Sequence, residues 1–190
     1  MTDFEDDIKN SLKILRDGGV ILYPTDTVWG LGCDATSQKA VEKIFSIKER
    51  SESKSLIILV DSEAMLERYV KEIPAVASEI TGLSDTAVTI IYPEARNLAP
   101  GVASEDGSVG IRIAMDDFCK SLIGRFRKPL VSTSANLSGE PSPGYFGEIP
   151  ETIKDAVDYV VMYKRDDRRK HKASPVIKVE KNGVFKILRM

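Results

Sequence analysis

Two hydroxyl-rich stretches and one pair of cations carry the side chains of this sequence that best suit ligand chemistry. Thr25 and Thr27 follow an apolar run, and a second stretch rich in hydroxyls and turn-forming residues, 132–144, follows another. Lys48 and Arg50 stand at the end of a predicted helix. A lysine supplies a mobile charge and an arginine a planar fork, a combination that suits a polyphosphate. We expect a small polar ligand or a nucleotide here; the alternatives are ordinary strand exits and a charged helix end.

Arg112 is the third signal, because it stands inside the apolar run 108–113. A buried charge requires a partner, which is either a ligand carboxylate or phosphate or an internal Asp or Glu. The sequence has neither the Gly-x-x-x-x-Gly-Lys-Ser/Thr loop nor the Gly-x-Gly-x-x-Gly pattern of common nucleotide sites. A nucleotide would therefore be held by cations and hydroxyls distributed around a cleft.

Composition limits the classes of function. The chain has 190 residues, 42% hydrophobic and 29% charged, which predicts one compact domain over 1–190. Cys33, Cys119 and the single His171 are too few for a disulfide framework, a His/Cys metal site or a Ser-His-Asp triad. No apolar run is long enough for a membrane span and the first residues are acidic, so we expect a cytoplasmic protein.

The net charge of −2 argues against nucleic-acid binding by the chain as a whole. The run 164–172, called the basic segment below, nevertheless holds six Lys or Arg residues. Such a run is typically a solvated loop, and a phosphate or RNA contact is the alternative.

Hydrophobic periodicity predicts an α/β fold: a single domain with a twisted, mostly mixed β-sheet flanked by helices. The dipeptide Asn182-Gly183 predicts a closing hairpin. Expected helices cover 4–15, 37–48, 63–70, 74–80 and 116–126, and expected strands cover 20–23, 56–60, 87–92, 108–113, 129–131, 157–162, 174–179 and 184–188.

Four motifs in this order resemble the YrdC/Sua5 family, the threonylcarbamoyl-AMP synthases, in its short single-domain form. They are the run 23–33 (Tyr-Pro-Thr-Asp-Thr-Val-Trp-Gly-Leu-Gly-Cys), Lys-Glu-Arg at 48–50, Gly-Ile-Arg at 110–112 and Ser-Ala-Asn-Leu-Ser-Gly at 134–139. The resemblance implies a nucleotidyltransferase that makes threonylcarbamoyl-AMP and pyrophosphate from L-threonine, bicarbonate and ATP for the t6A modification of tRNA. Such a step needs positioning and stabilisation of phosphate charge more than a histidine base.

The resemblance also implies roles for individual residues. Asp26 becomes structural support, since this reaction gives it no proton to take. Mg²⁺ is implied as the companion of ATP, and no protein metal site is expected. Further implied partners are the t6A transferase machinery and RNA, either tRNA or double-stranded RNA. Threonine would be bound by Thr25, Arg112, Ser134 and Ser174, and ATP by Lys48, Arg50, Ser108, Asn136, Ser142 and Arg189, with Lys48 and Arg50 acting in catalysis.

The sequence departs from the family pattern at four places, namely Lys54-Ser55, Leu59, Gly144 and Ser174-Pro175. Because these departures surround the implied threonine site, one alternative is that this chain is a family member with a changed small-molecule substrate. An RNA-binding protein of the same fold is the other alternative.

Overall fold

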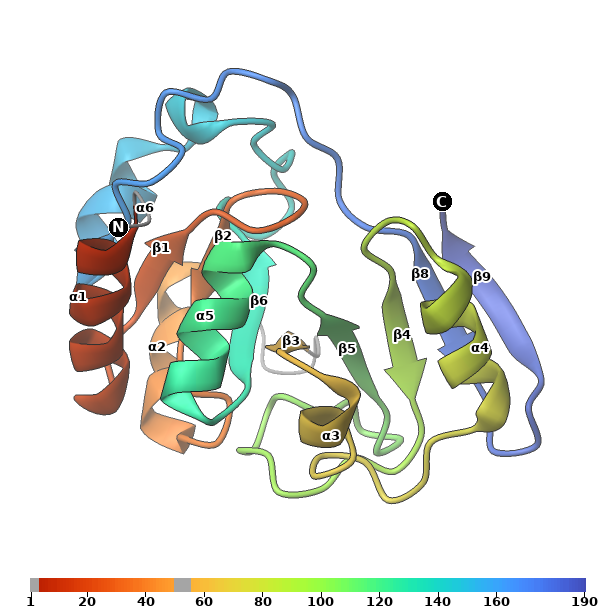
Figure 1. The fold of residues 1–190 in the computed structure, drawn as a ribbon. Helices are drawn as coiled ribbons and strands as arrows, with labels where there is room; N and C mark the ends of the chain where they lie inside the picture. The colour runs from red at the N-terminus through yellow and green to blue at the C-terminus, as the bar shows by residue number, and fades with distance from the viewer. Residues whose placement is uncertain (1–3, 50–55) are drawn as a thin grey trace.

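The computed structural model describes residues 4–49 and 56–190, which form a mixed β-sheet with helices packed against it (Figure 1). Over these residues the sheet has nine strands in the order β7-β1-β2-β6-β3-β5-β4-β8-β9. The strands are β1 (Ile21–Tyr23), β2 (Gly30–Gly32), β3 (Ile57–Val60), β4 (Thr89–Tyr92), β5 (Val109–Ile113), β6 (Leu130–Ser134), β7 (Tyr159–Val160), β8 (Val176–Val179) and β9 (Phe185–Arg189).

The helices are α1 (Glu5–Arg16), α2 (Gln38–Ile47), α3 (Glu63–Leu66), α4 (Ala75–Leu83), α5 (Asp117–Phe126) and α6 (Glu151–Ala156), with a 3₁₀ turn η1 (Phe146–Glu148). Side-chain caps begin three of them: Ser37, Ser62 and Asp116 each accept a hydrogen bond from a backbone amide in the first turn. None of the helices in the described part of the chain is long and apolar enough to cross a membrane.

The predicted α/β fold with a mixed sheet is confirmed. Pairs β1·β7, β3·β5 and β4·β8 are parallel, whereas the other neighbours are antiparallel. The predicted hairpin around Asn182-Gly183 joins β8 to β9, and Gly183 supplies the positive φ of 81° that the turn needs. In Figure 1, α1 and α5 lie side by side in front of the sheet.

The structure differs from the prediction where tertiary contacts override local pattern. The helix predicted over 63–70 ends at Leu66, because Val70 forms a bridge with Ala95 instead. The strand predicted over 157–162 is only Tyr159–Val160. The segments η1 and α6 were not predicted, since elements this short show too little periodicity to be recognised.

Strand β2 was not predicted either, and packing explains one of its two glycines. Gly30 and Gly32 were expected to allow a tight backbone path or the approach of a ligand. The ring of Tyr23 lies on Gly32, where a Cβ would come 2.5 Å from Cε1 of the ring. Gly32 therefore makes room for a buried side chain, whereas Gly30 lines the cavity described below.

We expect Gly32→Ala to lower the free energy of unfolding by about 1–3 kcal/mol, because the added methyl group overpacks against the Tyr23 ring. Urea unfolding measures the change. Gly82→Ala on α4 is the matched control, since nothing lies within 4 Å of the added Cβ and a helix favours alanine. Equal stability of Gly32→Ala and the wild type would contradict this account of β2.

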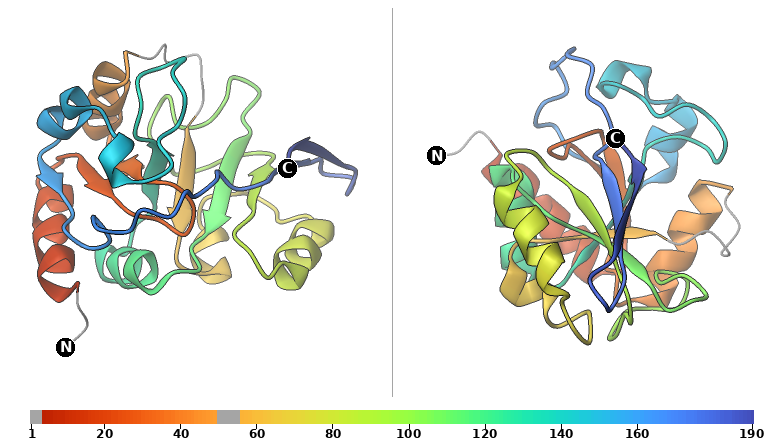
Figure 2. Two further views of the ribbon diagram at one scale, coloured as in Figure 1. Left: turned by 90° about the horizontal axis from the view of Figure 1, so that it is seen from above. Right: turned by 90° about the vertical axis from the view of Figure 1, so that its right-hand side faces the viewer.

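The segment 161–175, called the connecting segment below, joins β7 to β8. Figure 2 shows it running across the molecule from the β1 side of the sheet to the hairpin. Asp7 on α1 anchors its start, accepting hydrogen bonds from the backbone amides of Met162 at 2.9 Å and Tyr163 at 2.8 Å. The end of the connecting segment lies near the ends of β1 and β6, since Ala173 and Ser174 line one cavity with Thr27 and Ser134.

Candidate functional site

A cavity of about 240 Å³ lies where the loop after β1, the strands β5 and β6, and the connecting segment meet. Its apolar lining comes from Val28, Leu56, Ile57, Ala173 and Val176. None of the described residues that line it is an Asp or Glu, so it suits an anionic ligand better than a free cation. Its polar side chains are Arg112, Arg189 and the hydroxyls of Thr27, Ser132, Thr133, Ser134, Ser142 and Ser174.

Arg112 reaches this cavity from β5 and is buried, with 3% of its side chain exposed. Its Nη2 lies 3.2 Å from Oδ1 of Asp26, so the internal carboxylate left open by the sequence exists. Asp26 also accepts a hydrogen bond from the amide of Met115, just beyond β5, at 3.0 Å. The Nε of Arg112 is buried and has no hydrogen-bond partner among the described residues. An unpaired buried donor is costly, and a bound carboxylate or phosphate would satisfy it.

Thr25 lies behind Arg112 and is not part of the cavity lining. Its hydroxyl donates to the carbonyl oxygen of Val28 at 2.8 Å and accepts hydrogen bonds from the amide of Thr27 at 3.1 Å and from Nη2 of Arg112 at 3.3 Å. Thr25 therefore fixes the loop and the arginine in this conformation. Its predicted contact with substrate stays a prediction.

Lys48 and Asn136 lie together beyond the end of β6. Helix α2 ends at Ile47, and Glu49 takes a left-handed φ of 48°, so the helix has ended before Lys48, as convergence of Lys48 and Arg50 requires. The ammonium of Lys48 is buried and donates to the carbonyl oxygens of Ser134 and Asn136, the latter at 2.6 Å. Arg50 falls outside the described residues.

Oδ1 of Asn136 is buried and has no hydrogen-bond partner among the described residues. Its amide nitrogen donates to the carbonyl oxygens of Leu137 and Glu140, both at 2.8 Å. An available acceptor next to a buried ammonium could bind a ligand that offers both a hydrogen-bond donor and a negative charge.

The end of the connecting segment brings Ser174 to the cavity, and strand β9 of the C-terminal hairpin brings Arg189. Nε and Nη2 of Arg189 donate to the carbonyl oxygen of Ser174 at 3.0 and 2.7 Å, and the Ser174 hydroxyl lies 2.7 Å from that of Thr89. The carbonyl oxygen of Pro175, where the sequence departs from the family pattern, accepts a hydrogen bond from the amide of Thr89. Leu59, another departure, is buried beside Arg112 in the register of β3 and β5.

Ser108 is not brought to this cavity. It directly precedes β5, at the end of the strand opposite to Arg112. It lines a separate hollow with Lys178, and its hydroxyl donates to Oδ1 of Asp106 at 2.6 Å. The hydroxyl and amide of Ser108 are the main reason that the pKa of Asp106 is lowered to about 2. Its role in ATP binding stays a prediction.

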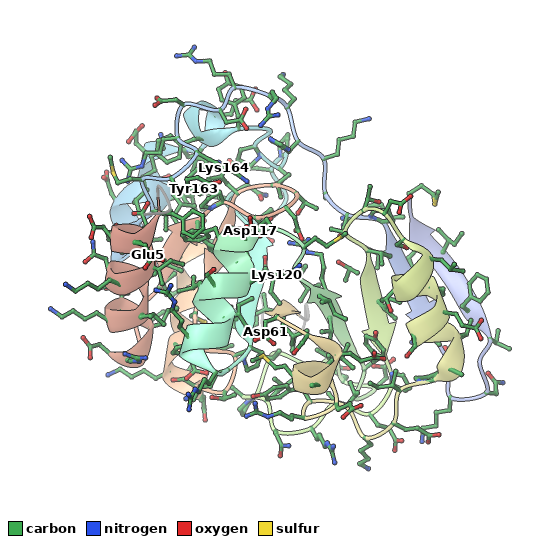
Figure 3. The ribbon with its side chains drawn as sticks, in the orientation of Figure 1. Glu5, Asp61, Asp117, Lys120, Tyr163 and Lys164 are labelled. Carbon is green, nitrogen blue, oxygen red and sulfur yellow. The ribbon has the colours of Figure 1, made fainter. Side chains whose placement is uncertain are left out.

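The basic segment, which lies within the connecting segment, is largely irregular and partly neutralised by acidic neighbours. Arg169 pairs with Asp167 at 2.6 Å, and Lys170 pairs with Glu148 at 3.3 Å. At its start, Tyr163 packs against the rings of Phe4 and Phe118, and Figure 3 shows Tyr163 and Lys164 above α1 and α5. The expected solvated loop is present, with acidic partners that the residue count did not reveal.

Burial raises the pKa values of the thiols of Cys33 and Cys119, so both stay protonated near neutral pH. The structure has both cysteines free and buried. Burial also raises the pKa of Asp116, and Asp26 adds to that shift. The chemistry of the site therefore depends on Arg, Lys and hydroxyl groups.

The model of the Sua5/YciO/YrdC family, described as "Telomere recombination", matches residues 13–190. This chain belongs to that family. It is similar to a protein named threonylcarbamoyl-AMP synthase from Pseudoalteromonas translucida, with 36% identity over 81% of this chain and 84% of the relative. A protein of the same name from Vibrio cholerae is 32% identical over 86% of this chain and 88% of the relative.

Solved structures of the family share the fold. P. abyssi Sua5, solved in complex with L-threonine, has a TM-score of 0.78 and 28% identity, covering 92% of this chain. This chain spans about half of that protein, 51% of its length. E. coli YciO has a TM-score of 0.82 at 22% identity over 97% of this chain and 88% of its own, a likeness of fold alone.

Five of the ten predicted site residues line one cavity, namely Arg112, Ser134, Ser142, Ser174 and Arg189. Thr27, Ser132 and Thr133 also line the cavity; the sequence placed them in the stretches suited to a ligand, but the family resemblance gave them no role, and Val28 was not singled out. The hydroxyls among them belong to the same two stretches as the predicted residues, which was the available signal. Periodicity could not say which would face the cavity, because the first stretch is an irregular loop.

Proposed function

We propose that this chain is an L-threonylcarbamoyladenylate synthase, a nucleotidyltransferase that makes the intermediate for the t6A modification of tRNA. Arg112 carries this proposal: it is a buried arginine in the lining of a polar cavity, and its Nε has no hydrogen-bond partner among the described residues. The relatives named threonylcarbamoyl-AMP synthase and the threonine complex of P. abyssi Sua5 support it.

In the proposed reaction, the amine of threonine and bicarbonate form a carbamate with loss of water. A carbamate oxygen then attacks the α-phosphate of ATP, and pyrophosphate leaves. Arg112 would hold the threonine carboxylate, with Ser134 and Ser174 on the same side of the cavity. Catalysis then depends on alignment and on stabilising the charge of the phosphates.

ATP would bind towards Lys48 and Asn136, with Ser142 and Arg189 at the cavity and Arg50 and Ser108 as further proposed contacts. Lys48 would offer its buried positive charge, and Asn136 its unpartnered Oδ1, to the nucleotide. Arg189, whose guanidinium is already oriented by Ser174, would face the phosphates.

Mg²⁺ fits this site only as the companion of ATP. Among the described residues no group of three His, Cys, Asp or Glu side chains could hold a metal ion, and the cavity lining offers hydroxyls without carboxylates. We propose that phosphate oxygens and water bind the ion, which when bound neutralises phosphate charge. The residues of this chain orient the two substrates around it.

We expect calorimetry to detect L-threonine binding with ATP present and much weaker binding of L-serine, together with pyrophosphate release that requires both threonine and bicarbonate. A family member with a changed substrate would instead bind another amino acid or none. Absence of threonine-specific heat and of threonine-dependent pyrophosphate release in the wild type would contradict the proposed function.

Binding to RNA and to the t6A transferase machinery stays a prediction for this chain. The ion pairs of Arg169 and Lys170 reduce the charge that the basic segment offers to phosphate, which weakens the case for RNA binding as its main function.

A further inference from the structure

The loop between β1 and β2 contains two threonine hydroxyls with different surroundings. The hydroxyl of Thr25 has one proton, which it gives to the carbonyl oxygen of Val28 at 2.8 Å, because a carbonyl can only accept. Its two lone pairs are shared by three donors: the amide of Thr27 at 3.1 Å, the hydroxyl of Thr27 at 3.1 Å and Nη2 of Arg112 at 3.3 Å. Thr25 has little capacity left for a ligand.

Thr27 is partly exposed and lines the cavity with Arg112. Its hydroxyl lies 3.1 Å from that of Thr25. Since the only hydroxyl proton of Thr25 is already used on Val28, Thr27 is the donor in this pair. The oxygen of Thr27 then presents only lone pairs to the cavity and acts there as a hydrogen-bond acceptor.

Arg112 supplies the complementary chemistry, because a guanidinium can only donate. A cavity with a donor fork and a hydroxyl acceptor matches an α-amino acid, which carries a carboxylate together with N–H and O–H donors. We propose that Thr27 is a substrate-binding residue whose hydroxyl accepts a hydrogen bond from the amino or hydroxyl group of the amino-acid substrate, while Thr25 and Asp26 position Arg112. This inference rests on the proposed function.

The test is Thr27→Val, which keeps the shape of the side chain and its backbone amide but removes the acceptor. We expect L-threonine to bind about 3- to 10-fold more weakly by calorimetry, the effect of one lost neutral hydrogen bond. The melting temperature and ATP binding should stay as in the wild type, and Thr27→Ser should restore binding. Thr152→Val, on the exposed part of α6, is the matched control.

L-2-Aminobutyrate, which lacks the hydroxyl of threonine, identifies the bonded group. If Thr27→Val weakens threonine but not 2-aminobutyrate, Thr27 accepts from the substrate hydroxyl; if it weakens both equally, Thr27 accepts from the amino group. Unchanged threonine affinity in Thr27→Val would overturn the inference while leaving the proposed function intact. Absence of threonine binding in the wild type would instead refute the proposed function.

Discussion

Replacing Arg112 with alanine should abolish measurable threonine binding and lower threonine-dependent pyrophosphate release by about 100-fold or more. The variant loses the donors proposed to bind the carboxylate, and truncating one partner of a buried charge pair costs about 2–5 kcal/mol in binding. It also leaves the carboxylate of Asp26 unpaired, so we expect the free energy of unfolding to fall by about 3–5 kcal/mol. Calorimetry, a pyrophosphate assay and urea unfolding measure these effects.

Arg112→Lys separates binding from stability, because it keeps the charge beside Asp26 but removes the planar fork. We expect this variant to fold and still to bind threonine weakly. Arg125→Ala is the matched control: Arg125 pairs with Glu5 at 2.8 Å on the surface, where an ion pair contributes little. If Arg112→Lys or Arg112→Ala binds threonine as well as the wild type does, Arg112 is not the carboxylate site.

Replacing Lys48 with methionine should reduce ATP-dependent pyrophosphate release by about 100-fold or more, because the variant loses the Lys48 charge from the proposed phosphate site. The substitution keeps the length of the side chain but removes the Lys48 donor from the carbonyl oxygens of Ser134 and Asn136, of which that of Ser134 keeps the amide of Asn136 as a donor. We therefore also expect a loss of about 1–3 kcal/mol in the free energy of unfolding. A pyrophosphate assay at saturating threonine, with urea unfolding in parallel, measures both.

Lys120→Met is the control for this prediction, since Lys120 is exposed on α5 and Figure 3 shows it away from the connecting segment. Calorimetry should show a larger loss of ATP affinity than of threonine affinity in Lys48→Met. Full activity in a folded Lys48→Met variant would remove Lys48 from the phosphate site and limit it to joining α2 to the end of β6.

Much of the fold follows from local sequence pattern. The apolar run that became β3 is continuous, the run that became β5 is interrupted by Arg112, and the capped amphipathic stretch that became α5 has an unambiguous period. The pattern failed where pairing at a distance decided the structure. Val70 forms a bridge with Ala95 and is therefore not part of the predicted helix. Gly30 and Gly32 belong to a strand because β2 pairs with β1 and β6.

For the candidate site, too, some features were predictable from the sequence and others were not. The sequence alone determined the α/β class, the resemblance to the family and the chemical types gathered at the site, because these depend on residue identity and order. Only the tertiary structure decided that Asp26 pairs with Arg112, that Ser108 lies in another hollow, and that Thr27 rather than Thr25 faces the cavity. Side-chain direction in an irregular loop has no sequence period, and it is set by contacts with residues far along the chain.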